Sequence, residues 1–179
     1  MLLKVVIIGP ESTGKSTLAK SLAAHFDCLW VPEFARQYLE KLNRPYTFED
    51  LTEIAKGQIN LEEESLSKSK SLLLMDTDLH VIKVWSEHKF GKVDPWIVNQ
   101  IKSREYDAYI LTDIDMPWQE DPLREHPEPE KRQYFFDWYK RIVTQSGKPF
   151  VVVTGSEVSR SSRAIQFISK LLSYPNLKE

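Results

Sequence analysis

The sequence predicts an α/β fold in which a five-stranded parallel sheet carries helices on both faces. The first reason is that five short apolar runs alternate along the chain with segments whose apolar residues recur at helical spacing. The second is that a glycine-containing loop and an amphipathic helix follow directly after the first run. Strands of a parallel sheet are buried on both faces and read as continuous apolar segments, so we expect the runs to form the sheet.

Strands and helices are expected in alternation from the N-terminus. The apolar runs place strands at residues 3–8, 28–31, 72–75, 109–111 and 150–153. A first helix begins at about Lys15, and its apolar residues are four apart. Three further helices are indicated by apolar residues on one face, at Leu51, Ile54, Ala55 and Ile59, at Leu79, Ile82 and Trp85, and at Ala164, Ile165, Ile168, Leu171 and Leu172. Because the chain has 179 residues, 41% of them hydrophobic, and no low-complexity linker, we expect one domain over residues 1–179.

Charge and composition argue against several classes of function. The formal net charge is −2 and no run of five basic residues occurs, so a nucleic-acid partner is not expected. The apolar runs are too short to span a bilayer, so we expect no membrane association and a cytoplasmic location. The single cysteine, Cys28, allows no internal disulfide, and the four histidines show no zinc-ligand spacing.

Residues 9–17 read GPESTGKST and contain the phosphate-loop pattern G-x-x-x-x-G-K-[ST]. Glycines let backbone N–H groups approach phosphate oxygens, Lys15 carries a charge to the β- and γ-phosphates, and the Ser16 hydroxyl can ligate Mg²⁺. The helix that follows adds its positive N-terminal dipole. We therefore expect ATP and Mg²⁺ to bind here, with adenine contacts from residues 155–160 and in particular Gly155. The expected nucleotide contacts in the loop are Gly9, Glu11, Ser12, Thr13, Gly14, Lys15, Ser16 and Thr17.

Carboxylates follow the second, third and fourth expected strands, at the edge of the sheet where ligands bind in open α/β folds. Asp76 has the position of a carboxylate that holds Mg²⁺ together with Ser16, and the alternative is a cap for the next helix. Glu33 can face the γ-phosphate and accept the proton of an attacking hydroxyl, with Asp76 as the competing base. Glu33 also has an alternative role, an ion pair with Arg36, which itself is either a substrate contact or an exposed helix residue.

Residues 113–132 depart from the alternation and form what we call the lid segment. This stretch holds four of the ten prolines and mixes seven acids with three bases, so a regular core helix is not expected there. Connectors of this length are often functional lids or disordered segments, and we expect a lid that closes over phosphates, with a passive surface loop as the alternative. Arg124 and Arg132 are then candidates to stabilise the charge of a transferred phosphoryl group. Trp118 either stacks on a flat substrate ring or packs the lid.

These motifs together resemble the ribosylnicotinamide kinase domain of NadR-type NAD-biosynthesis proteins. The resemblance is carried by the phosphate loop and four further motifs, which are Glu33-Phe-Ala-Arg36 with Tyr38, Ala55-Lys-Gly57-Gln58, Asp76-Thr-Asp78 and Pro117-Trp-Gln-Glu-Asp-Pro-Leu-Arg124. It implies a nucleoside-kinase-like phosphate-loop fold and transfer of the ATP γ-phosphate to the 5′-hydroxyl of ribosylnicotinamide, which yields nicotinamide mononucleotide. The resemblance also implies that Arg124 closes over the phosphoryl group and that the substrate contacts are Glu33, Arg36, Tyr38, Asp76, Asp78 and Trp118.

The sequence departs from this family at two points. Pro122 stands where relatives often have glycine, which would stiffen the lid segment. No H-x-G-H motif of an adenylyltransferase occurs, so we expect a stand-alone kinase. Two other functions remain open, a kinase for a different nucleoside or small hydroxyl compound and a regulatory ATPase whose lid contacts a protein partner. No N-K-x-D guanine-reading sequence supports the second of these.

Overall fold

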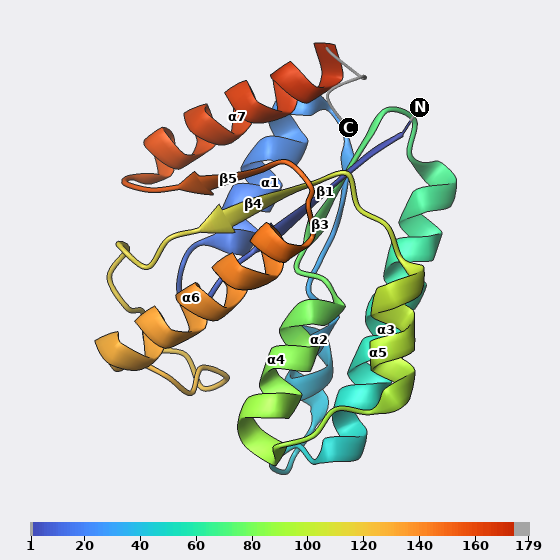
Figure 1. Ribbon diagram of the computed structural model, residues 1–179, viewed down its shortest axis with the longest axis vertical. Coiled ribbons are helices and arrows are strands. Elements are labelled where there is room, and N and C mark those ends of the chain that lie inside the picture. The colour runs from blue at the N-terminus through green and yellow to red at the C-terminus, as the bar shows by residue number, and fades with distance from the viewer. Residues whose placement is uncertain (1, 174–179) are drawn as a thin grey trace.

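Five parallel strands form one sheet in the computed structural model, which describes residues 2–173 (Figure 1). The strand order is β2-β3-β1-β4-β5, and every neighbouring pair is parallel. The bounds are β1 Leu3–Ile8, β2 Leu29–Val31, β3 Leu72–Asp76, β4 Ala108–Thr112 and β5 Phe150–Val153. The predicted five-stranded parallel sheet is confirmed, with strand ends that differ from the expected ones by one residue at most.

Seven helices are described, and they cover both faces of the sheet. The bounds are α1 Lys15–Phe26, α2 Phe34–Lys41, α3 Phe48–Lys68, α4 Leu79–Phe90, α5 Pro95–Ser103, α6 Pro129–Gln145 and α7 Glu157–Ser173. Helices α1 and α7 pack on one face, against Val5 and Ile7 of β1. Helices α4 and α6 pack on the other, against Val6 and Ile8. Alternate β1 side chains thus enter two cores, as expected for a strand buried on both faces.

Helices α2, α3, α4 and α5 form a third apolar cluster beside the sheet (Figure 1). This cluster lies next to the carboxyl end of β2 and fixes where the segment after that strand runs. The side chain of Gln58 on α3 accepts the backbone N–H of Phe34 at 2.8 Å and donates to the Pro32 carbonyl at 3.3 Å. Two hydrogen bonds from one buried amide therefore hold the residues on either side of Glu33.

The lid segment is shorter than the sequence predicts. Residues 129–132 form the first turn of α6, with Pro129 at a position where its missing N–H is not needed. The irregular connector therefore covers residues 113–128, and we keep the name lid segment for these residues. Within residues 2–173, no helix is long and apolar enough to cross a membrane.

Gly57 allows α2 to approach α3, and we expect Gly57→Ala to destabilise the protein. A methyl group there would lie 2.1 Å from Cε1 of Phe34, whereas alanine gains only about 1 kcal/mol of helix propensity over glycine. Overpacking costs about 1–3 kcal/mol, and contacts of 2.1–2.4 Å with the Phe34 ring put this site in the upper part of that range, so after the gain in propensity the free energy of unfolding should fall by about 1–2 kcal/mol. Urea denaturation measures it, with Lys56→Ala on the exposed face of the same helix as the control. A Gly57→Ala protein as stable as the parent would contradict the packing described.

Candidate active site

The phosphate loop joins β1 to α1 in a conformation that its glycines permit. Gly9 and Gly14 have φ angles of 153° and 76°, in the region that favours glycine. A Cβ atom on Gly9 would lie 2.3 Å from the Thr112 hydroxyl oxygen, so no side chain fits between the loop and β4. The Thr13 hydroxyl donates to the Pro10 carbonyl at 2.7 Å and lies 2.7 Å from that of Thr112. Helix α1 has no side-chain N-cap, so its first N–H groups remain available to an anion.

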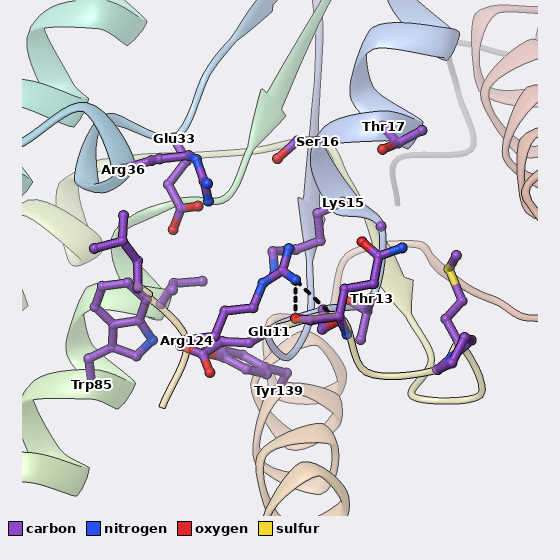
Figure 2. Close-up of a pocket in the computed structure, with 18 of the residues that line it drawn as sticks. Glu11, Thr13, Lys15, Ser16, Thr17, Glu33, Arg36, Trp85, Arg124 and Tyr139 are labelled. Carbon is purple, nitrogen blue, oxygen red and sulfur yellow. Dashed lines mark hydrogen bonds between the residues drawn. The ribbon is translucent and has the colours of Figure 1, made fainter. Parts of the chain in front are cut away.

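A cavity of about 170 Å³ opens beside this loop, at the carboxyl ends of the strands (Figure 2). It brings together residues from the phosphate loop, the segment after β2 and the lid segment. The Lys15 ammonium donates to the Pro10 carbonyl at 2.8 Å, within its own loop. The predicted site residues that line the cavity are Gly9, Glu11, Ser12, Thr13, Gly14, Lys15, Ser16, Thr17, Glu33, Arg36 and Arg124.

Glu33 is the N-cap residue of α2 and points toward the cavity (Figure 2). Burial raises the pKa of its carboxyl to about 7, because the ionised form loses solvation, and the negative charges of Asp76 and Glu11 raise it further. Lys15 and Arg36 act in the opposite direction. A carboxyl group with this pKa is half ionised near neutral pH and can accept a proton.

Asp76 ends β3 and is 1% exposed. Burial raises the pKa of its carboxyl, and a hydrogen bond with Ser16 and the charge of Lys15 oppose this. Its Oδ1 atom has no hydrogen-bond partner among the described residues, which is costly for a buried carboxylate oxygen. A divalent cation suits a free carboxylate oxygen beside a serine hydroxyl, so these two residues fit Mg²⁺. Within residues 2–173, no group of three or more His, Cys, Asp or Glu side chains is arranged so that it could hold a metal ion.

The lid segment covers the phosphate loop, and hydrogen bonds join the two. The Ser12 hydroxyl accepts the backbone N–H of Gln119 at 2.8 Å, and the Glu11 carboxylate accepts that of Glu125 at 3.0 Å. Between these two points, the guanidinium of Arg124 donates to the Gln119 carbonyl and, at 3.4 Å, to the Ser12 hydroxyl. The loop side chains thus hold the lid on both sides of Arg124.

Two helices hold the lid segment from the other side. Arg36 on α2 forms an ion pair with Asp121 at 2.7 Å, in place of the predicted alternative pair with Glu33. Glu125 pairs with Lys89 on α4 at 2.9 Å and accepts the Tyr46 hydroxyl at 3.1 Å. The lid is therefore closed over the cavity in this structure.

Five side chains predicted at the site do not line the cavity, and the first is Asp76, which is buried at the end of β3. Tyr38 donates to Asp50 at 2.8 Å, away from the phosphate loop. Asp78 caps α4 by accepting the His80 N–H at 3.0 Å, the role that was the alternative for this motif. Trp118 packs on the guanidinium of Arg132, 5.8 Å from its ring centroid, which is the packing alternative. The Arg132 guanidinium itself donates to backbone carbonyls behind the loop.

The cavity also has an apolar wall that sequence reasoning missed. Trp85 and Val81 of α4, Leu39 of α2 and Tyr139 of α6 line it, and Trp85 lies across the cavity from Lys15 of the phosphate loop (Figure 2). The helical spacing that includes Trp85 marks a core-facing position, so the pattern gave no reason to place this ring at a ligand. A flat, partly apolar molecule can pack against this wall while its polar end faces Glu33.

A second cavity of about 620 Å³ lies between α1 and the start of α7. Gly14 and Thr17 of the loop and α1 line one side, and Val158, which is 80% exposed, lines the other. The segment predicted to contact adenine therefore borders this cavity. Gly155 itself is not among the lining residues, and its N–H donates to the carboxylate of Asp115.

Comparison with known proteins identifies relatives of the same architecture. Residues 4–160 match the family model described as AAA domain. The chain is 25% identical over 175 residues to the trifunctional NAD biosynthesis/regulator protein NadR of Escherichia coli, covering 94% of this chain and 42% of NadR. The chain thus spans less than half the length of this curated relative.

Solved structures give the fold. A NadR protein crystallised in complex with NR matches with a TM-score of 0.83 at 21% identity, over 96% of this chain and 52% of that one. NadR in complex with NAD and AMP-PNP matches with a TM-score of 0.77 at 22% identity, over 94% of this chain and 49% of that one. Deoxyadenosine kinase from M. mycoides matches with a TM-score of 0.63 at 14% identity, over 94% of this chain and the full length of the kinase. The fold is that of phosphate-loop kinases, and the chain belongs to the AAA domain family as a relative of the NadR proteins, as its motifs predict.

Proposed function

We propose that this protein is an ATP-dependent kinase that phosphorylates the 5′-hydroxyl of ribosylnicotinamide and so serves NAD salvage. The observation that carries the proposal is the 170 Å³ cavity, where Lys15 and Arg124 lie on one side and Glu33 and the Trp85 wall on the other. A triphosphate on the loop would place its γ-phosphate between the cations and the carboxylate. The relationship to NadR, one structure of which holds NR, supports ribosylnicotinamide as the acceptor.

The phosphate-binding part of the proposal uses the loop and the lid. Lys15 and the N–H groups at the start of α1 bind the β- and γ-phosphates, and Arg124 closes over the phosphoryl group in transfer. Ser16 and Asp76 would hold Mg²⁺, which would offset the negative charge of the phosphates. The 620 Å³ cavity beside Gly14 takes the adenine, with residues 157–160 at its edge.

The acceptor-binding part of the proposal uses the apolar wall. The ring of the nucleoside packs against Trp85 and Tyr139, and its ribose end faces Glu33. Glu33 accepts the proton of the 5′-hydroxyl as that oxygen attacks the γ-phosphate. Asp76 is the competing base, but its contact with Ser16 and its orphaned oxygen favour the metal role.

The raised pKa of Glu33 predicts a pH dependence. A base works only when ionised, so kcat/KM should rise with pH through about 7 and reach a plateau above pH 8. Below the pKa, the rate should fall about tenfold for each pH unit. Initial rates at saturating Mg²⁺ between pH 5.5 and 9 measure this, with Glu33→Gln as the control for the titration of ATP itself. If the parent and Glu33→Gln share the same inflection, the titrating group is not Glu33.

A panel of acceptors tests the substrate. Purified protein with ATP and Mg²⁺ should give a kcat/KM for ribosylnicotinamide well above those for uridine, cytidine and deoxynucleosides. A preference for one of these nucleosides would mean that the protein is a kinase with a different acceptor. Hydrolysis of ATP that no acceptor accelerates would favour the regulatory ATPase instead.

A further inference from the structure

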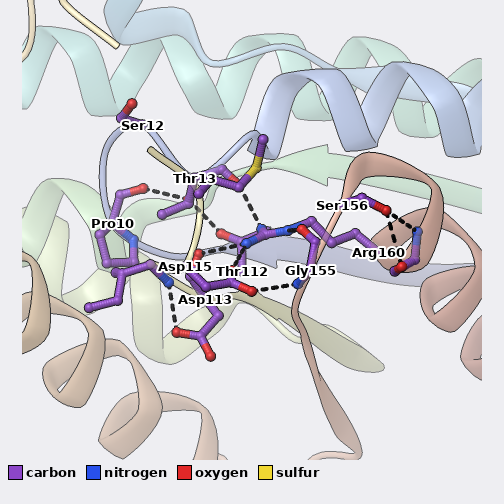
Figure 3. A network of polar contacts seen from close by, with 12 residues as sticks. Pro10, Ser12, Thr13, Thr112, Asp113, Asp115, Gly155, Ser156 and Arg160 are labelled. Atoms are coloured by element: carbon purple, nitrogen blue, oxygen red, sulfur yellow. Dashed lines mark hydrogen bonds and ion pairs between the residues drawn. The ribbon is translucent and has the colours of Figure 1, made fainter. Parts of the chain in front are cut away.

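Arg160 is a buried cation that the proposed reaction does not use directly. It lies on α7, is 2% exposed, and its guanidinium joins three segments around the phosphate loop (Figure 3). It donates to the Thr13 carbonyl at 2.9 Å, to the Gly155 carbonyl at 2.9 Å and to the Asp113 carbonyl at 3.0 Å. It is also paired with the carboxylate of Asp115, which offsets its charge. A cation buried in this way holds its partners in one fixed arrangement.

The contact with Thr13 determines the orientation of a peptide group at the phosphate site. The peptide bond between Thr13 and Gly14 is planar and trans, so its C=O and N–H point in opposite directions. Arg160 binds the carbonyl from outside the loop, and Gly14 lines the cavity. The Gly14 N–H is therefore directed toward the position that an anion takes.

A second arginine donates to the carbonyl of the preceding peptide. Arg132 donates to the Ser12 carbonyl at 3.4 Å and to the Met116 carbonyl at 3.0 Å. Ser12 has a φ angle of 56°, a conformation that costs free energy for a residue other than glycine and persists only where its surroundings hold it. Gly14 has a φ angle of 76° and a flexible backbone. The peptide between Thr13 and Gly14 can therefore rotate unless a side chain holds it.

We propose that Arg160 is a positioning residue for phosphate binding, which fixes the peptide between Thr13 and Gly14 so that its N–H faces the triphosphate. This inference rests on the proposed nucleotide-binding function. Because Arg160 acts on the phosphate-binding backbone, its loss should weaken the binding of phosphates much more than the binding of the adenine moiety. A residue that merely stabilised the fold would affect both alike.

Binding measurements on Arg160→Met test the proposal. Calorimetry with magnesium tripolyphosphate and competition with adenosine separate the phosphate contacts from the base contacts, since Arg160 also borders the 620 Å³ cavity. We expect the affinity for tripolyphosphate to fall about 10- to 100-fold, as for loss of a hydrogen bond to a charged group, and that for adenosine to fall by a smaller factor, because Arg160 only borders the adenine cavity. Arg163→Met, on the exposed face of the same helix, is the matched control and should bind both like the parent.

The outcomes separate this inference from the proposed function. Unchanged tripolyphosphate binding by Arg160→Met, or an equal loss for adenosine, would overturn the positioning role. A parent protein that binds neither ATP nor tripolyphosphate would instead overturn the proposed function. If Arg160→Met does not fold, as judged by circular dichroism, Arg160→Lys replaces it, because an ammonium keeps the charge but lacks the planar fork that serves several carbonyls. Tripolyphosphate binding by Arg160→Lys should then be weakened selectively, and parent-like binding would refute the proposal.

Discussion

Lys15→Ala is expected to abolish turnover with every acceptor, by at least about 10³-fold. Its ammonium lies at the phosphate loop, and its charge lowers the pKa of the Glu33 and Asp76 carboxyl groups. Its removal takes away a phosphate contact that every acceptor requires, and the charge that stabilises the transferred phosphoryl group. It also removes the positive charge that lowers the pKa of Glu11, Glu33 and Asp76, so the bound triphosphate meets less compensated negative charge. Initial rates at saturating ATP and Mg²⁺ measure the loss.

The control for this prediction is Lys20→Ala, on the exposed face of the same helix. Its activity should stay within about twofold of the parent, because it lies outside the cavity. A Lys15→Ala protein that keeps a tenth of the parent activity would refute the assignment of the phosphate loop.

Glu33→Gln and Asp76→Asn are both expected to lower kcat by about 10² to 10⁴, the range for removal of a general base or of a catalytic metal contact. The two losses have different causes in our account. Glutamine at position 33 cannot take the proton of the attacking hydroxyl, and no ion replaces that role. Asparagine at position 76 retains an oxygen that still ligates Mg²⁺, with lower affinity. Raising Mg²⁺ should therefore restore part of the activity of Asp76→Asn and none of that of Glu33→Gln.

Rates over a Mg²⁺ titration from about 0.1 to 50 mM, at a fixed excess of ATP·Mg²⁺, separate the two roles. Asp113→Asn is a suitable control, since this carboxylate follows β4 but lines neither cavity. If Mg²⁺ rescued Glu33→Gln but not Asp76→Asn, the assigned roles would be reversed, with Asp76 as the base and Glu33 as the metal ligand.

The sheet could be predicted from the sequence because its strands are continuous apolar runs. The helices α5 and α6 were not predicted, although apolar residues such as Phe135, Tyr139 and Val143 of α6 recur at helical spacing, because each helix begins at a proline that resembles a loop proline. The end of the lid segment was placed four residues late for a related reason. Pro129 was counted with the loop prolines, although a proline at the first position of a helix is favourable.

The site residues that could be predicted are those whose place is fixed by their position directly after a strand. Residues of the phosphate loop and Glu33 follow a strand directly, so the end of that strand fixes their place. For residues farther from a strand end, the direction of the side chain depends on its local hydrogen-bond partners. Tyr38 donates to Asp50 and Asp78 caps a helix, so neither side chain lines the cavity. The place of Trp85 in the cavity wall could not be predicted, because core residues and cavity-lining residues recur at the same spacing along a helix.

The path of the γ-phosphate tests the central claim most directly. The protein is incubated with Mg²⁺, ribosylnicotinamide and ATP that carries a label on its γ-phosphate, and the products are separated. We predict that the label appears on the 5′-oxygen of nicotinamide mononucleotide, with one ADP formed for each labelled product. Label recovered only as inorganic phosphate, at a rate that ribosylnicotinamide does not change, would contradict it.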